Sequence, residues 1–150
     1  MTMGTVAGAQ ILEVGPRDAW KILSEDAAAV LVDVRTRPEW SFVGGPDLSD
    51  LDRDVLQVEW KFWPDMAPNP AFAETVMDGA GAQPSRILFI CRSGARSMQA
   101  AQAVAETLSA KGISVECINV AEGFEGDLDD AGRRGTFNGW KARGLAWAQS

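Results

Sequence analysis

A cysteine followed closely by two arginines marks the segment ILFICRSGARSMQAAQ (residues 87–102), the part of the sequence best suited to chemistry. Cys91 comes directly after four apolar residues, and Arg92 and Arg96 flank a glycine-containing turn before an expected helix. Backbone N–H groups at such a turn and the positive end of a helix stabilise a thiolate or an oxyanion. Settings of this kind lower the pKa of cysteine thiols from about 8.5 to roughly 3.5–7.5. The pattern therefore predicts a reactive thiolate at Cys91, although a free cysteine is often only a small buried apolar residue.

The chain contains no histidine. This excludes His-based zinc sites, Ser/His/Asp triads and Cys/His dyads, so any nucleophile must be activated without imidazole. Cys91 and Cys117 lie in different apolar segments, without the spacing of a metal site or a disulfide scaffold. We expect two reduced thiols and no metal ion, with Cys117 in the core because it alternates with Val115 and Ile113 along one strand face.

The elements that must position Cys91 alternate between β and helical patterns. Strand-like apolar runs occupy residues 11–14, 30–34, 55–58, 87–90 and 113–120. Helical patterns occupy residues 17–25, 70–78 and 95–111, the last with a glycine C-cap at Gly112. This alternation predicts an α/β fold with a mostly parallel five-stranded sheet and helices on both faces. The run 87–90 is apolar throughout, as expected of a central strand.

One domain is expected over residues 9–150, after a flexible N-terminus at residues 1–8. Two stretches rich in Asp and Gly, 36–54 and 122–139, are predicted to be long loops.

Charge and hydropathy limit the partners. With 21 acidic against 14 basic side chains the net charge is −7, which disfavours nucleic acid and anionic lipid as partners. No apolar stretch approaches the roughly 20 residues that span a bilayer, and residues 1–10 lack the pattern of a secretory signal. We therefore expect a cytoplasmic protein without a membrane or nucleic-acid partner.

Four segments carry a resemblance to a known family. The segments LVDVRTRPEW (31–40), ILFICRSGARSMQAA (87–101), AEGFEG (121–126) and GWKARGLAW (139–147) together resemble a single-domain rhodanese, from residue 9 onward. The resemblance implies a sulfurtransferase without metal or organic cofactor, in which Cys91 is the catalytic nucleophile and forms a persulfide. It also implies a loop whose backbone amides wrap the sulfur, formed by Arg92, Ser93, Gly94, Ala95 and Arg96.

The rhodanese-like reading has two competitors. Cysteine-dependent phosphatases and arsenate reductases place five residues between the cysteine and a phosphate-binding arginine, whereas four intervene here, and their usual preceding histidine is Ile90. The other competitor is a non-catalytic docking or sulfur-relay module that acts with a protein partner. An intact cysteine beside two arginines favours the enzyme, and turnover with small donors would separate the two.

Other residues receive supporting roles. Asp33 ends an apolar strand and Arg35 follows it, and we expect an ion pair that fixes the loop, for instance Arg35 with Glu39, in preference to contact with substrate. We expect Trp40 in the core, and the aromatic group around Trp60 and Trp63 in the core in preference to a docking surface.

Two segments depart from the family pattern. SFVGGPDLSDLDRD (41–54) lacks the usual histidine, and EGDLDDAGRRGTFNGW (125–140) lengthens the usual connection to a final helix that carries tryptophan. Arg133 and Arg134 in the second segment could reach an anionic donor, but a basic pair on a solvated loop is more often inert.

The expected reaction is a two-step transfer. The Cys91 thiolate takes a sulfane sulfur from thiosulfate, a persulfide or a polysulfide, and a thiophilic acceptor then removes it. The expected partners are a small sulfur donor and a small acceptor, cyanide or a thiol, with a protein acceptor as a further possibility.

Overall fold

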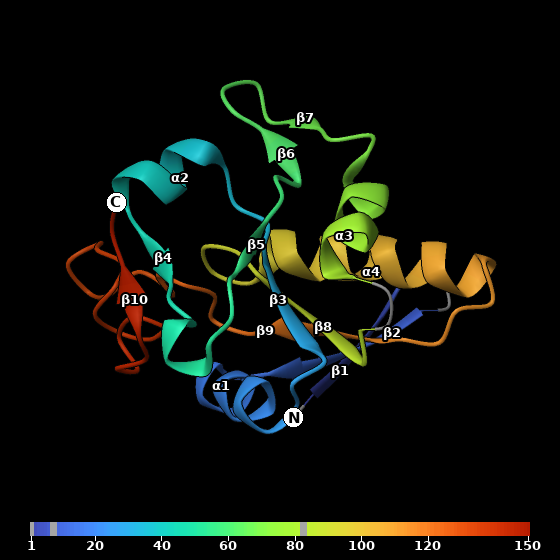
Figure 1. Cartoon of the computed structure of the whole chain (residues 1–150). Helices are drawn as coiled ribbons and strands as arrows, with labels where there is room; N and C mark the ends of the chain where they lie inside the picture. The colour runs from blue at the N-terminus through green and yellow to red at the C-terminus, as the bar shows by residue number, and fades with distance from the viewer. Residues whose placement is uncertain (1, 7–8, 82–83) are drawn as a thin grey trace.

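The structure, a computed structural model, describes residues 2–6, 9–81 and 84–150, with side chains from residue 11 onward. Its main sheet has the order β1-β2-β9-β8-β3-β5. The strands are β1 (Thr2–Val6), β2 (Ala9–Val14), β9 (Glu116–Val120), β8 (Arg86–Ile90), β3 (Ala29–Asp33) and β5 (Leu56–Gln57). All pairs are parallel except β1 with β2. The predicted five-stranded parallel sheet is confirmed, with one antiparallel strand added at its edge (Figure 1).

Helices cover both faces of this sheet, as the alternating pattern predicts. Helix α1 (Pro16–Glu25) packs on one face, and α3 (Phe72–Ala80) and α4 (Ala95–Ala110) pack on the other (Figure 1). Strand β8 contributes Ile87 and Phe89 to the core beneath α3 and α4, and its alternate residues to the core beneath α1. Its central place explains why the run 87–90 is apolar throughout.

The N-terminus differs from the flexible segment predicted for residues 1–8. Residues Thr2–Val6 form β1, with Thr2 paired to Glu13 and Val6 to Ala9, while residues 1, 7 and 8 lie outside the described part of the chain. The small and polar residues here carry little apolar periodicity. A strand can still form because its ladder uses backbone N–H and C=O groups that the edge of β2 leaves unpaired.

The predicted loop at 36–54 contains a helix. Helix α2 (Arg37–Phe42) begins with the capping-box residues Thr36 and Glu39, in which the backbone N–H and the hydroxyl of Thr36 both donate to the Glu39 carboxylate. Pro38 lies in its first turn. A 3-10 turn (Ser49–Leu51) and the two-residue strand β4 (Gly45–Pro46) follow. The pattern T-x-x-E at residues 36–39 is a helix-start signal that the Asp- and Gly-rich composition of the stretch obscures.

The remaining segments are irregular. Strands β6 (Lys61–Phe62) and β7 (Ala67–Pro68) form a short hairpin, and residues 122–139 contain neither helix nor strand, which confirms the second predicted loop. The final helix implied by the family resemblance is absent from residues 139–150. Turns cover 140–144 and lead to β10 (Trp147–Ala148), which pairs with β4. Gly144 has positive φ, a conformation in which the chain leaves the helical path and ends the turn.

No helix in the described ranges is both long and apolar enough to cross a bilayer.

Candidate active site

Cys91 lies where β8 ends and the turn into α4 begins. Its residue surface is 1% exposed, and its Sγ accepts a hydrogen bond from the backbone N–H of Gly94 at 3.1 Å. Gly94 has φ +112° and caps α4, so the chain turns sharply and directs this N–H inward at the sulfur. The sulfur therefore lies at the N-terminal end of a 16-residue helix, where the helix dipole places partial positive charge.

The segment after β9 supports this turn from beneath. The N–H of Phe124 donates to the carbonyl of Cys91 at 2.8 Å, and that of Glu125 to the carbonyl of Arg92 at 3.0 Å. Gly123 makes this approach possible: a Cβ there would lie 2.5 Å from the carbonyl carbon of Arg92 and 2.6 Å from the carbonyl oxygen of Cys91. The motif AEGFEG thus holds the backbone of the cysteine loop in place.

A buried polar chain runs behind the sulfur. The hydroxyl of Ser97 lies 3.2 Å from Cys91 Sγ and 2.5 Å from Asn119 Oδ1. Asn119 Nδ2 donates to the carboxylate of Glu13 at 2.7 Å and to the carbonyl of Gly94 at 3.2 Å. A carboxylate and a carbonyl only accept, so they fix which end of the amide faces each way and leave its oxygen toward Ser97.

Sequence reasoning missed this chain. Ser97 lies on α4, Asn119 on β9 and Glu13 on β2, so only the parallel arrangement of the strands brings them together. A polar residue within an apolar strand was the available signal, because buried amides and hydroxyls need partners. Asn119 and Ser97 are both 0% exposed.

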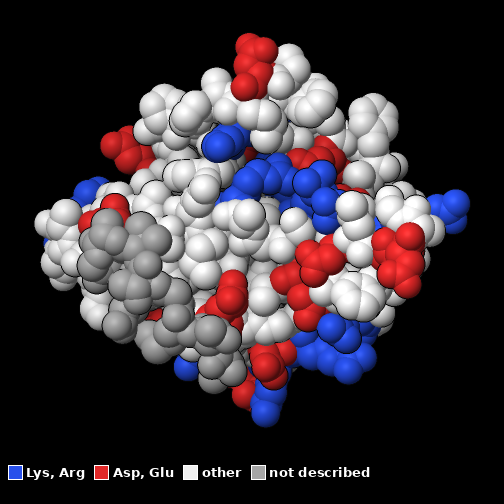
Figure 2. Space-filling view, turned by 180° about the vertical axis from the view of Figure 1, so that it is seen from behind, with Lys and Arg blue, Asp and Glu red and all other residues white. Residues whose placement is uncertain are grey.

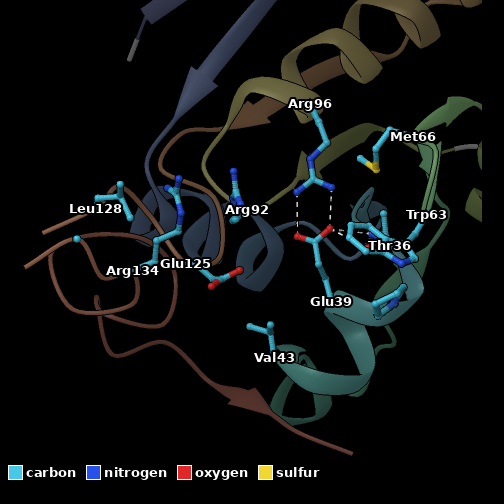
Figure 3. A pocket seen from close by; sticks show the side chains of 12 residues that line it. Thr36, Glu39, Val43, Trp63, Met66, Arg92, Arg96, Glu125, Leu128 and Arg134 are labelled. Atoms are coloured by element: carbon cyan, nitrogen blue, oxygen red, sulfur yellow. Dashed lines mark hydrogen bonds and ion pairs between the residues drawn. The ribbon is translucent and has the colours of Figure 1, made fainter.

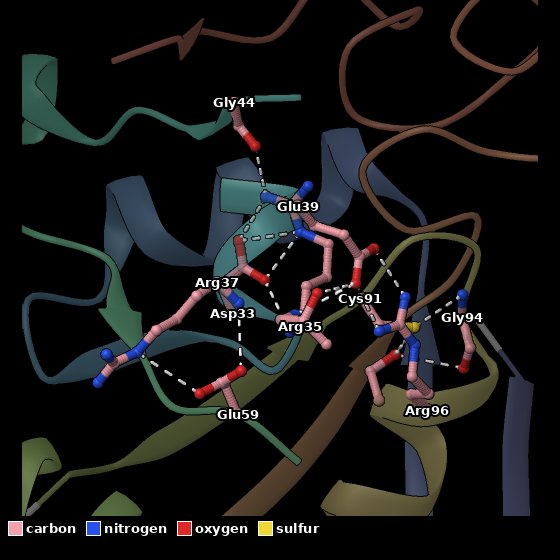
Figure 4. A network of polar contacts seen from close by, with 11 residues as sticks. Asp33, Arg35, Arg37, Glu39, Gly44, Glu59, Cys91, Gly94 and Arg96 are labelled. Carbon is pink, nitrogen blue, oxygen red and sulfur yellow. Dashed lines mark hydrogen bonds and ion pairs between the residues drawn. The ribbon is translucent and has the colours of Figure 1, made fainter. Parts of the chain in front are cut away.

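The second loop arginine is paired with a carboxylate. Arg96 and Glu39 form a two-pronged ion pair, with Nη1–Oε1 at 2.7 Å and Nη2–Oε2 at 2.9 Å (Figure 4). Burial opposes ionisation of Glu39, but the hydrogen bonds and charge of Arg96 outweigh it and lower the pKa of the carboxyl. The same hydrogen bonds raise the pKa of Arg96. The positive charge of Arg96 is therefore largely neutralised within the site.

Arg35 pairs with a different acid from the one expected. Its guanidinium contacts Asp33, with Nη2–Oδ2 at 2.7 Å, and donates to the carbonyl of Gly44 at 2.6 Å (Figure 4). The carbon of this guanidinium also lies 4.6 Å from the centre of the Phe124 ring. The suggested pair with Glu39 does not form, because Glu39 faces Arg96 across the loop. Asp33 and Arg35 are both 0% exposed. They join β3 to the segment before β4.

A pocket of about 660 Å³ opens beside the cysteine loop (Figure 3). Its wall combines three arginines, two glutamates and several apolar side chains. The lining residues are Thr36, Pro38, Glu39, Val43, Trp63, Met66, Arg92, Arg96, Glu125, Leu128, Gly132 and Arg134. The basic pair 133–134 is thus divided: Arg134 lines the pocket and donates to the carbonyl of Gly126 at 2.7 Å, whereas Arg133 is exposed and outside the lining.

The aromatic residues Trp60 and Trp63 also differ in their burial. Trp60 is half-buried and meets Phe72 edge-on at 5.0 Å, whereas Trp63 is 62% exposed at the pocket. Trp40 is half-buried, and its indole N–H lacks a partner among the described residues. Cys117 is 3% exposed, and burial raises the pKa of its thiol to about 12, which agrees with a place in the core.

Comparisons with known proteins identify close relatives. No protein-family model matches the chain. The uncharacterized protein RC0915 of Rickettsia conorii is 36% identical over 129 residues, which cover 86% of this chain and 90% of that protein. The crystal structure of Rv0390 from M. tuberculosis is 45% identical, has a TM-score of 0.78, and covers 92% of this chain and 97% of its own.

Solved structures of lower sequence identity identify the fold. A rhodanese-like domain protein from Staphylococcus aureus has a TM-score of 0.50 at 18% identity, covering 93% of this chain and 99% of its own. This chain therefore has the rhodanese-like fold. The homodimeric polysulfide-sulfur transferase of Wolinella succinogenes shares the fold, with a TM-score of 0.53 at 20% identity, over 93% of this chain and 80% of its own. At these identities the likeness concerns the rhodanese-like fold alone.

Proposed function

We propose that this rhodanese-like chain is a sulfurtransferase and that Cys91 carries the transferred sulfur as a persulfide. The observation that supports this most directly is the enclosure of Cys91 Sγ at the start of α4, with the Gly94 N–H at 3.1 Å. A thiolate stabilised by an amide and a helix terminus is nucleophilic without a base. This suits a chain that contains no histidine.

The reaction has two displacement steps at sulfur. First the Cys91 thiolate attacks the sulfane sulfur of thiosulfate or of an organic persulfide. A bond forms between Sγ and that sulfur while the donor's S–S bond breaks, and sulfite or a thiolate leaves with the electron pair. In the second step cyanide or a thiolate attacks the outer sulfur, and Cys91 leaves as a thiolate. No external oxidant or reductant is needed.

The loop backbone provides the electrostatic support. The Gly94 amide is already oriented toward the sulfur and needs no reorganisation when charge develops there, which is how fixed donors lower a barrier. Arg92 adds positive charge at the loop, and Gly94, Ser93 and Ala95 form its turn. Arg96 contributes mainly by anchoring the loop, because Glu39 takes up its charge.

Intact mass spectrometry tests the proposal. The protein is measured before thiosulfate, after it, and again after cyanide, with Cys91→Ser and Cys117→Ser in parallel. We expect wild type and Cys117→Ser to gain one sulfur atom that cyanide removes, and Cys91→Ser to gain none. No gain in wild type, with alkylation showing a free Cys91 thiol, would refute the thiosulfate reaction and favour a docking or sulfur-relay module.

A further inference from the structure

The size of the pocket exceeds what inorganic thiosulfate needs. Thiosulfate has five heavy atoms, and at the roughly 30 Å³ of a water-sized group it would fill about 150 Å³. The pocket holds about 660 Å³. Cavities of several hundred Å³ are typical of sites for small organic molecules.

The pocket is lined by two arginines besides the ion pair of Arg96 with Glu39. Arg96 is neutralised by Glu39 through contacts of 2.7 and 2.9 Å. Arg92 and Arg134 also line the pocket, and within the described ranges neither forms an ion pair with a carboxylate. In Figure 3 both side chains lie toward Leu128, on the opposite side of the view from Trp63 and Met66. Arg92 and Arg134 thus place two positive charges along one wall, against the single carboxylate of Glu125 that lies beside them in Figure 3.

The positions of these arginines matter because thiosulfate and organic persulfides carry their negative charge at different distances from the transferred sulfur. In thiosulfate the negative charge lies within two bonds of the transferred sulfur, so its binding needs cations at the reacting centre. An organic persulfide can instead carry a carboxylate several bonds from its sulfur, within reach of arginines elsewhere in the pocket, such as Arg134. Figure 2 shows basic side chains gathered near the middle of the face turned away in Figure 1, with acidic ones around them. A chain of net charge −7 thus concentrates basic groups locally.

Apolar side chains complete the same pocket. Trp63 is 62% exposed and Leu128 55% exposed, and the half-buried Met66 belongs to the turn between β6 and β7. Large apolar groups exposed around a cavity mark a surface that a ligand covers. Thiosulfate offers no apolar atoms to cover them, whereas the carbon skeleton of an organic donor does.

We infer that the sulfur donor of this site is a low-molecular-weight organic persulfide that carries a carboxylate, which Arg92 and Arg134 bind while Leu128 and Trp63 contact the carbon skeleton. The inference rests on the proposed sulfur transfer and names its substrate class. The Cys91 thiolate attacks the terminal sulfur of R–S–SH, the donor's S–S bond breaks, and R–S⁻ leaves and is protonated to R–SH. Cys91 becomes Cys–S–SH, so atoms and electrons balance without a further reactant.

A matched pair of donors isolates the carboxylate. The persulfide of N-acetylcysteine carries one, and the persulfide of N-acetylcysteine amide does not. Second-order rates of sulfur loading onto Cys91 are measured by quenching and intact mass spectrometry for wild type, Arg92→Gln, Arg134→Gln and Arg134→Lys. Arg133→Gln is the control, since it removes an adjacent arginine that lies outside the pocket.

The measured quantity is the loading rate with the N-acetylcysteine persulfide divided by the rate with its amide, at low salt. We expect this ratio to be about tenfold higher for wild type than for Arg92→Gln or Arg134→Gln, the effect of losing one charge-assisted hydrogen bond. Comparing ratios between variants cancels the intrinsic difference in reactivity of the two donors. Arg134→Lys and Arg133→Gln should keep the wild-type ratio. Leu128→Ser should slow both organic donors relative to thiosulfate, and this second variant does not depend on the hydrogen bond from Arg134 to Gly126.

Three outcomes would overturn the inference. If the acid-to-amide rate ratio is unchanged in Arg92→Gln and Arg134→Gln, these arginines do not bind the carboxylate, while the proposed sulfur transfer would stand. Thiosulfate loading faster than both organic donors would assign the site to the inorganic donor. If no donor, thiosulfate included, adds sulfur to Cys91, the proposed function itself fails and the inference fails with it.

Discussion

The contact between Glu39 and Arg96 makes a specific prediction about stability. Glu39→Gln keeps the shape of the side chain and an oxygen that Thr36 can donate to, but removes the negative charge. It also turns an N–H group toward Arg96, which offers only donors. We therefore expect loss of the ion pair between α2 and α4 with the capping box partly retained.

The size of the effect follows from partial burial. The side chains of Arg96 and Glu39 are 19% and 20% exposed. Breaking a fully buried pair costs roughly 3–5 kcal/mol, and an exposed pair contributes about 0–1 kcal/mol. An intermediate value of about 2 kcal/mol lowers the melting temperature by roughly 4–8 °C for a domain of this size.

The pH dependence gives a second signature. The pKa of Glu39 is lowered in the folded state, so the stabilisation is fully present above the unfolded-state value near 4.5. It is lost as the pH falls through the lowered, folded-state pKa. The difference between wild type and Glu39→Gln should therefore stay constant from about pH 8 to pH 5 and shrink below that range.

Urea unfolding followed by circular dichroism measures this difference. Glu116→Gln is the control, because its contact with Arg86 spans 3.8 Å between side chains that are 51% and 41% exposed, and it should change stability by under about 0.5 kcal/mol. Equal stability of wild type and Glu39→Gln at pH 7 would contradict our account of the pair. So would a difference that stays constant well below pH 4.

Three further predictions concern the cysteine loop and the core. Gly123→Ala should destabilise the fold by about 2 kcal/mol more than Gly132→Ala in urea titrations, because both glycines have positive φ but only a Cβ at Gly123 meets backbone atoms; equal losses would refute this close approach. Ser97→Ala should destabilise the fold by about 1–3 kcal/mol in urea titrations, because it leaves the buried Oδ1 of Asn119 without the hydroxyl that donates to it; unchanged stability would show that this buried hydrogen bond is not needed. Cys117 should resist iodoacetamide up to pH 9 in the native protein and react only after unfolding, because burial raises the pKa of its thiol to about 12; peptide mass mapping checks this, and labelling of the native protein would contradict it.

The sequence was most informative where one local pattern determines structure. An apolar run with no polar face predicts the central strand β8, and the helical period with a closing glycine predicts α4. Their junction places Cys91 at a helix N-terminus, and this requires no knowledge of the rest of the chain. Helix α2 was missed although its capping box is also local, because the stretch around it is rich in Asp and Gly.

Contacts between distant segments were less accessible. The carboxylate of Glu39 could pair with any nearby arginine, and only the position of α2 over the cysteine loop selects Arg96 in preference to Arg35. The difference between Arg133 and Arg134 likewise depends on which way one turn of the loop faces. From the charge pattern alone, Arg133 and Arg134 would be assigned the same role. In the fold, Arg134 lines the pocket and Arg133 is exposed to solvent.

The absence of histidine and the polar chain behind Cys91 belong to one arrangement. Imidazole is the side chain that ordinarily titrates between pH 5 and 8, and the chain has none. The groups that touch the sulfur are a backbone amide and the hydroxyl of Ser97, neither of which ionises in that range. Asn119 orients the hydroxyl, and Glu13 orients Asn119. Neither printed contact of the Cys91 sulfur therefore supplies a base between pH 6 and 8, and the amide and the hydroxyl keep the same charge when the pH changes over that interval.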